Sequence, residues 1–137
     1  MWVKLFNQKF NTVYEGLKDS GTDHNVIVDG FLKYALKKLD IQKAPAVILN
    51  QDKQRVNELC SMAGYMQKDN KIWIYTGKRN SADIIRSLAH ELVHCKQKEL
   101  GVAPIDGTTG SKDENEANSV AGILLRTYGK LNPEIYE

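Results

Sequence analysis

The sequence predicts an α+β fold in which a small mixed or antiparallel sheet packs on a central helix, with additional helices around it. Short apolar runs bounded by turn residues occupy the middle of the chain, between 46 and 75. Apolar residues at helical spacing precede and follow this region. The length of 137 residues is typical of one domain. We therefore expect a single domain over 1–137, with a helical pair at 4–40 and the sheet and core at 44–128.

Composition excludes several classes of protein. Hydrophobic residues make up 42% and charged residues 26%, as in ordinary globular proteins. The net charge of +2 gives no strong signal for nucleic acid or a membrane surface. No apolar stretch approaches the roughly 20 residues of a membrane span, and the first residues do not resemble a signal peptide. The two cysteines are too few for a disulfide framework, so we expect a cytoplasmic protein.

Two helices are predicted before the sheet. The first spans about 4 to 19, where aromatic and aliphatic residues recur at helical spacing, and it ends at the turn 19–21. The second begins at Thr22 or Asp23, either of which can cap it, and its apolar stripe extends to Leu39.

The sheet is predicted from three short segments. A strand at 46–49 comes first, and the following stretch, 51–62, fits either a polar loop or a short helical turn. The segments 63–66 and 71–75 flank the polar residues 68–70, which predicts an antiparallel hairpin.

Two more helices follow the hairpin. Asn80 or Ser81 can cap the first of them, which we expect to end near Gly101. A loop over 102–110 comes next, and its length favours a function beyond simple connection, such as gating of a site. The last helix is expected over about 113–128.

The motif His90-Glu91-Leu92-Val93-His94 falls in the middle of the best-defined predicted helix. Residues four apart lie on one helix face, so His90 and His94 can present two imidazole nitrogens to one metal ion. Glu91 lies about 100° round the helix from His90, which places its carboxylate beside the ion without ligating it. This offset suits a general base acting on a metal-activated water.

A third protein ligand must come from a carboxylate, since no histidine follows His94. His24, in the second predicted helix, is more typical of a surface or capping residue. Cys95 can be a soft ligand but is better explained as a core thiol, because it points about 100° away from His94. The candidates downstream are Asp106, Asp113, Glu114 and Glu116.

Helix capping competes with metal binding for these acids. Ser111 with Glu114 and Asp113 with Glu116 both have the spacing of a capping box. If the first pair caps the helix, Glu116 is free to point inward and meet the metal.

The segment Asn115-Glu116-Ala117 resembles the gluzincin zinc peptidases, whose third zinc ligand is a glutamate in an N-E-A or x-E-A context on a separate helix. The resemblance covers roughly 47–128 and implies a minimal zincin-like fold with one zinc ion held by His90, His94 and Glu116. It implies a zinc-dependent endopeptidase that hydrolyses peptide bonds by a metal-activated water, with Glu91 as the general base. The helix is also similar to those of phage-encoded and ImmA/IrrE-like metallopeptidases, although Val93 stands where the latter often have glycine.

In such enzymes a hairpin precedes the motif helix, and the outer strand of this hairpin binds the substrate backbone in extended form. By position this is the edge strand 63–66, where Gly64 would allow close approach of a peptide or protein substrate, and a plain sheet edge is the alternative. The apolar Val120 occupies the position of an aspartate that orients a histidine in thermolysin-like enzymes. The partner of His90 is then sought in Asn118, Ser119 or a backbone carbonyl. The candidates for stabilising the oxyanion are Tyr128, Tyr136 and Arg126.

Two other functions stay open from the sequence. One is a non-catalytic, zinc-stabilised module that binds a peptide or protein. The other is a nucleic-acid-associated protease, which the absence of a third motif histidine and of a basic appendage makes the least favoured reading.

Overall fold

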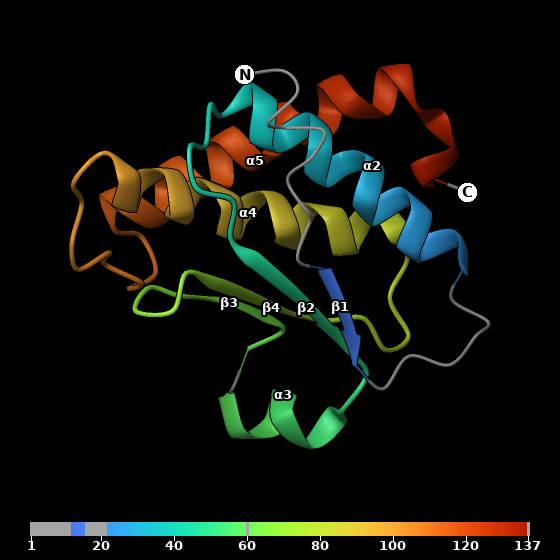
Figure 1. Cartoon of the computed structure of the whole chain (residues 1–137), viewed down its shortest axis with the longest axis horizontal. Helices are drawn as coiled ribbons and strands as arrows, with labels where there is room; N and C mark the ends of the chain where they lie inside the picture. Colours follow the sequence, from blue (N-terminus) through green and yellow to red (C-terminus); the bar gives the residue numbers. More distant parts are fainter. Residues whose placement is uncertain (1–11, 16–21, 60, 137) are drawn as a thin grey trace.

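The computed structural model describes residues 12–15, 22–59 and 61–136 (Figure 1). The elements in chain order are β1 (Thr12–Glu15), α2 (Thr22–Lys38), β2 (Ala46–Asn50), α3 (Lys53–Leu59), β3 (Ala63–Met66), β4 (Lys71–Tyr75), α4 (Ser81–Glu99), α5 (Lys112–Leu131) and the 3-10 helix η2 (Pro133–Tyr136).

The four strands form one mixed sheet in the order β1-β2-β4-β3. β2 pairs in parallel with both β1 and β4, whereas β3 pairs antiparallel with β4. The pairing of Gly64 with Trp73 sets the register of the β3–β4 hairpin, which confirms the hairpin expected from the sequence. β3 is therefore an edge strand, and one side of its backbone has no neighbouring strand among the described residues.

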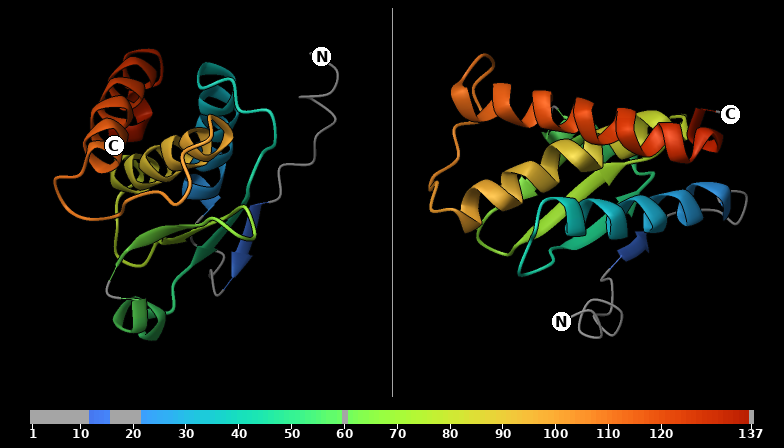
Figure 2. Two further views of the ribbon diagram at one scale, coloured as in Figure 1. Left: turned by 90° about the vertical axis from the view of Figure 1, so that its left-hand side faces the viewer. Right: turned by 90° about the horizontal axis from the view of Figure 1, so that it is seen from above.

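The helices α2, α4 and α5 lie on one face of the sheet, and α3 lies on the other (Figures 1 and 2). The α+β fold, with a mixed sheet packed on the helix that carries the motif, is confirmed. The buried residues of β2 and β4 and the apolar face of α4 supply the centre of the core. Its fully buried members include Val47, Leu49, Ile72, Ile74, Ile84, Ile85, Leu88 and Leu92. Each such side chain contributes about 1.5–3 kcal/mol by leaving water.

Side-chain caps fix where the two long helices begin. The Asn80 side chain accepts a hydrogen bond of 2.8 Å from the backbone N–H of Asp83, at the start of α4. Ser111 caps α5 by accepting one of 3.2 Å from the N–H of Glu114. Both caps satisfy backbone donors that have no partner inside the helix.

The helix expected over 4–19 is wrong where it can be compared. Residues 12–15 form β1, in which Val13 is paired with Ile48 of β2. The rest of that predicted helix lies outside the described residues. Thr, Val and Tyr favour strands, and pairing with β2 outweighs a helical periodicity that is local to the chain. The helical pair at 4–40 is thus replaced, in the described part, by a strand followed by α2.

The stretch 51–62, which fitted either a loop or a helical turn, contains the short helix α3. Within the described ranges, no helix combines the length and the apolar character needed to span a membrane.

Replacement of Leu88 by Ala should destabilise the fold, because this α4 side chain is 0% exposed. We expect the free energy of unfolding, measured by urea titration, to fall by about 2–5 kcal/mol. Ile123→Ala is the matched control, since Ile123 is 65% exposed on α5 and should change stability by less than about 0.5 kcal/mol. Equal losses for the two variants would contradict the assignment of α4 to the core.

Candidate metal centre

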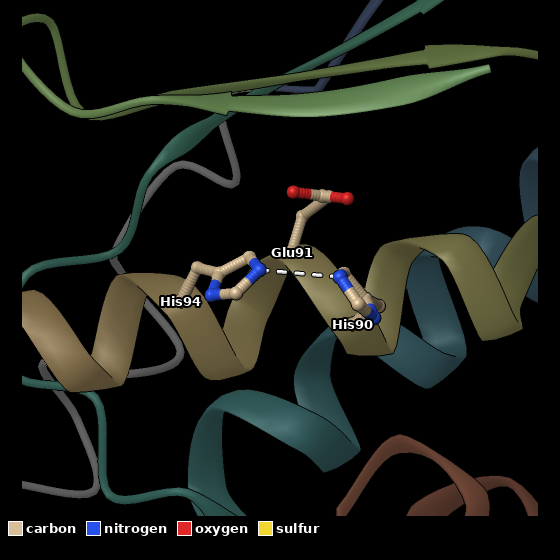
Figure 3. A group of neighbouring side chains, drawn as sticks. All are labelled: His90, Glu91 and His94. Atoms are coloured by element: carbon tan, nitrogen blue, oxygen red, sulfur yellow. Dashed lines mark hydrogen bonds between the residues drawn. The ribbon is translucent and has the colours of Figure 1, made fainter. Parts of the chain in front are cut away.

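The motif residues lie in the middle of α4, as the sequence predicted, and the side chains of His90 and His94 point toward each other (Figure 3). The Nε2 atoms of His90 and His94 are 3.1 Å apart on successive turns. One ligand atom from each of His90, Glu91 and His94 lies within 4.8 Å of those of the other two. Glu91 is directed toward the sheet, while the two imidazole rings face each other (Figure 3). This arrangement is a possible metal-binding group.

Gln97 fixes which nitrogen of His94 carries the proton. Its side chain is 3% exposed, and its Nε2 donates to the backbone carbonyl of Asp113 at 3.0 Å and to Oε1 of Glu116 at 2.8 Å. The amide oxygen is therefore the end that faces His94, at 2.8 Å from Nδ1. Because this oxygen can only accept, Nδ1 of His94 is the donor and Nε2 keeps its lone pair.

Asn118 does the same for His90. Its Oδ1 lies 2.9 Å from Nδ1 of His90, so this nitrogen donates as well. Asn118 was one of three partners considered for His90 from the sequence, and the other side-chain candidate, Ser119, has no such contact. Two neutral amides thus orient both rings and direct both Nε2 lone pairs at one point.

Glu114 supplies the carboxylate nearest to this point. Its Oε2 lies 3.3 Å from Nε2 of His90 and makes a shorter contact with Nε2 of His94. Three acceptor atoms therefore converge, namely the Nε2 atoms of His90 and His94 and Oε2 of Glu114. Their electron pairs repel one another, and a cation bound among them would be attracted to all three. Two nitrogens that ligate one tetrahedral zinc ion at its usual bond length lie about 3.3 Å apart, close to the observed 3.1 Å. The donor set fits a divalent ion with one coordination position left open.

Glu116, the predicted third ligand, is elsewhere. Its side chain is exposed and its Oε1 accepts the hydrogen bond from Gln97. Glu114 and Glu116 differ by about 200° round the helix, so only one of them can face the two histidines. The other two candidates, Asp106 and Asp113, accept hydrogen bonds within the loop. The geometry favours Glu114 as the third ligand.

The capping argument explains why the sequence favours Glu116 over Glu114. Ser111 does accept from the Glu114 N–H, but the Ser111 N–H already donates to the carbonyl of Thr108 at 3.0 Å. The Glu114 carboxylate is therefore not needed to complete the capping box. The sequence does contain a signal that Glu114 faces inward. The inward-facing positions of α5 are 117, 121, 124 and 128, and the same helical face one turn earlier is at position 114.

Glu91 is 8% exposed, and its pKa is raised to about 7. Burial is the main cause, and the negative charge of Glu114 adds to it, whereas His94 and a hydrogen bond from the backbone of Tyr65 lower the pKa. A carboxyl with this pKa can both take up and release a proton near neutral pH.

A cavity of about 290 Å³ opens beside the three acceptors. Alternate residues of the β3 region, Ala63, Tyr65 and Gln67, line one side of it, and Ile105 and Gly107 of the loop line the other. Gly64, singled out by the resemblance, pairs with β4 instead and does not line this cavity.

The loop 102–110 forms a wall of the cavity, where a gate had been considered. The N–H of Ile105 donates to Oε1 of Gln67 at 3.3 Å, which joins the loop to the end of β3. The N–H of the next residue, Asp106, donates to Oδ2 of Asp113 in the first turn of α5 at 2.9 Å. Both contacts hold the loop at the side of the cavity in this structure.

The remaining candidates lie apart from the acceptors. Tyr128 is buried against Phe31 in the core, and neither Tyr136 nor Arg126 lines the cavity. Cys95 is a buried free thiol whose pKa burial raises to about 11, as expected of a core thiol. His24 belongs to α2, and its side chain lies outside the described part of the structure.

Comparisons with protein-family models, with curated proteins and with solved structures found no significant match. Function is therefore argued from the site itself.

The amide of Gln97 should matter for metal binding although it touches no ion. Gln97→Met keeps the length of the side chain and removes the acceptor for His94, so we expect zinc affinity to fall about 10–100-fold. Competition with a chromophoric chelator measures this affinity. The exposed Gln42, far along the chain, provides the control, and Gln42→Met should bind zinc like the wild type. Equal zinc affinities for the two variants would show that the hydrogen bond between Gln97 and His94 is not needed for metal binding.

Proposed function

We propose that this chain is a zinc-dependent endopeptidase that uses Glu91 as its general base. The observation that carries the proposal is the convergence of two oriented imidazole lone pairs and the Glu114 carboxylate beside Glu91. A cavity bounded by a sheet edge lies next to them. Each of these features is needed for metal-assisted hydrolysis, and they occur at one place.

His90, His94 and Glu114 would hold the ion. When bound, zinc supplies a Lewis acid that polarises a carbonyl group and acidifies water. The amides of Gln97 and Asn118 keep both imidazoles in the ligating tautomer, so little reorganisation is needed on binding.

Glu91 would take a proton from the attacking water and deliver it to the leaving amine. Its hydrogen bond from the Tyr65 backbone fixes the carboxylate between the sheet edge and the histidines. A proton acceptor in this position is on the side from which a substrate in the cavity is attacked. The low exposure of Glu91 keeps bulk water away from the proton during transfer.

Peptides are the favoured substrate class because of the strand edge. The hydrogen bond from Tyr75 N–H to the Met62 carbonyl sets the pattern of the β3–β4 ladder. In that pattern the backbone groups of Ala63 point away from β4, toward the unpaired edge. Within the described part of the chain they hydrogen-bond only to the hydroxyl of the exposed Ser61, which an incoming extended backbone can displace. Strand addition at this edge would lay a peptide across the cavity.

Removal of Glu114 should identify the third ligand. Loss of a residue that only supports a ligand lowers metal affinity up to about 100-fold. We expect Glu114→Ala to weaken zinc binding by more than this. Glu116→Ala removes only a partner of Gln97 and should cost about 10-fold or less. Zinc content after dialysis and competition titration give both values. The reverse order of effects would return the ligand role to Glu116.

Exchange of Glu91 for glutamine should separate chemistry from metal binding. Glu91→Gln keeps the size of the side chain but cannot accept the proton, so peptide cleavage should fall at least about 10²–10⁴-fold. Zinc affinity should stay unchanged. A peptide library, digested with and without chelator, measures cleavage by wild type and variant. Full activity of the variant would remove Glu91 from the mechanism, and zinc binding without any cleavage by the wild type would indicate a binding module.

A further inference from the structure

A second cavity, of about 350 Å³, lies on the other side of His90 and Glu91. It shares Ser61, Ala63, His90 and Glu91 with the first cavity, so the two adjoin each other beside the candidate metal centre. Asn118 and Ala121 of α5 form its far wall. A substrate that crosses the metal centre along β3 therefore extends into this second space.

Arg79 engages the polar side chains of α4 that line this cavity. Its guanidinium, with a side chain 7% exposed, contacts Oδ2 of Asp83 through Nε at 2.9 Å. Another nitrogen donates to the hydroxyl of Ser87 at 2.6 Å, and a third to the carbonyl of Tyr75 at 2.7 Å. Asp83, whose side chain is 53% exposed, is therefore paired with Arg79, and Ser87 has a partner.

Arg86 is left with its charge available. It is exposed, lines the same cavity and precedes His90 by one helical turn. Asp83 stands three residues before it, a spacing at which the two could pair, but Asp83 is held by Arg79. Arg86 has no hydrogen bond or ion pair with any residue that the structure describes. The other acidic group at this wall, Glu91, is buried and bonded to the Tyr65 backbone.

We propose that this second cavity is a subsite for a substrate carboxylate, which Arg86 binds. The inference rests on the proposed peptidase function and narrows its substrates to peptides with a carboxylate close to the cleaved bond. A guanidinium presents paired N–H donors that match a carboxylate and bind it in bidentate geometry. Arg86 and His90 are about 6 Å apart on the helix surface, and an extended peptide advances about 3.3 Å per residue. The carboxylate thus belongs within about two residues of the cleaved bond.

An acidic side chain or the C-terminal carboxylate can supply this group, and matched peptides separate the two. In the first set, Glu or Gln is placed in turn at each of the two residues before and the two residues after the cleaved bond. All peptides of this set have an amidated C-terminus. The other set ends two residues beyond that bond and carries a free or an amidated C-terminus. The zinc-loaded full chain is assayed for kcat/KM on every peptide.

We expect the wild type to prefer the carboxylate over the matching amide about 10–100-fold, at one position or at the C-terminus. Arg86→Gln should reduce this ratio to about one. Lys130→Gln removes the same charge from an exposed α5 residue outside both cavities and should leave the ratio as in the wild type. A wild type with no preference, or an Arg86→Gln variant that slows all peptides equally, would overturn the subsite.

A binding measurement keeps this test separate from the proposed function. If no peptide is cleaved, the peptidase proposal fails, and fluorescence anisotropy of the labelled peptides still tests the subsite. We expect carboxylate peptides to bind the zinc-loaded chain about 10–100-fold tighter than their amide counterparts, and Arg86→Gln to lose this difference. Equal binding of both peptide types by the wild type would overturn it. Thermal unfolding of each variant, unchanged from the wild type, verifies that the fold is intact.

Discussion

Leu88 and Leu92 of α4 are fully buried, and this packing against the sheet is the constraint on which the candidate site depends. α4 contacts β3 and β4 on one side and α5 on another. With its apolar face held by the core, the remaining faces have fixed directions. Glu91 then faces the edge strand and the two histidines face α5. Any rotation of α4 that moved the histidines would expose the leucines to water.

The polar contacts between α4 and α5 add orientation to this packing. Glu114 and Asn118 are four residues apart on α5, the same spacing as His90 and His94 on α4, so two successive turns of each helix meet. Gln97 then joins His94 to the start of α5. Its buried amide has partners for both its oxygen and its nitrogen, so the network avoids the cost of an unpaired buried group. These contacts direct the three acceptor atoms at one point.

Charge is distributed so that neighbouring acids and bases do not all neutralise one another. Arg79 is nearly buried and forms an ion pair with Asp83 of α4. Arg86, also on α4, stays exposed at the cavity. Glu114 and Glu116 also make different contacts. Glu114 faces the histidines, and Glu116 accepts a hydrogen bond from Gln97. In both pairs, residues of the same type receive different environments from their direction round a helix.

The sequence alone determined the motif helix, its Asn80 or Ser81 start, the β3–β4 hairpin and the possible metal pair His90 and His94. These follow from local periodicity, turn residues and the i to i+4 geometry of a helix, which need no knowledge of distant contacts. Only the tertiary structure decided that 12–15 is a strand, because its pairing with β2 is non-local. The same holds for the position of Glu114, rather than Glu116, beside the two histidines, which depends on how α5 is rotated against α4. It also holds for the unpaired charge of Arg86, which depends on the position of Arg79.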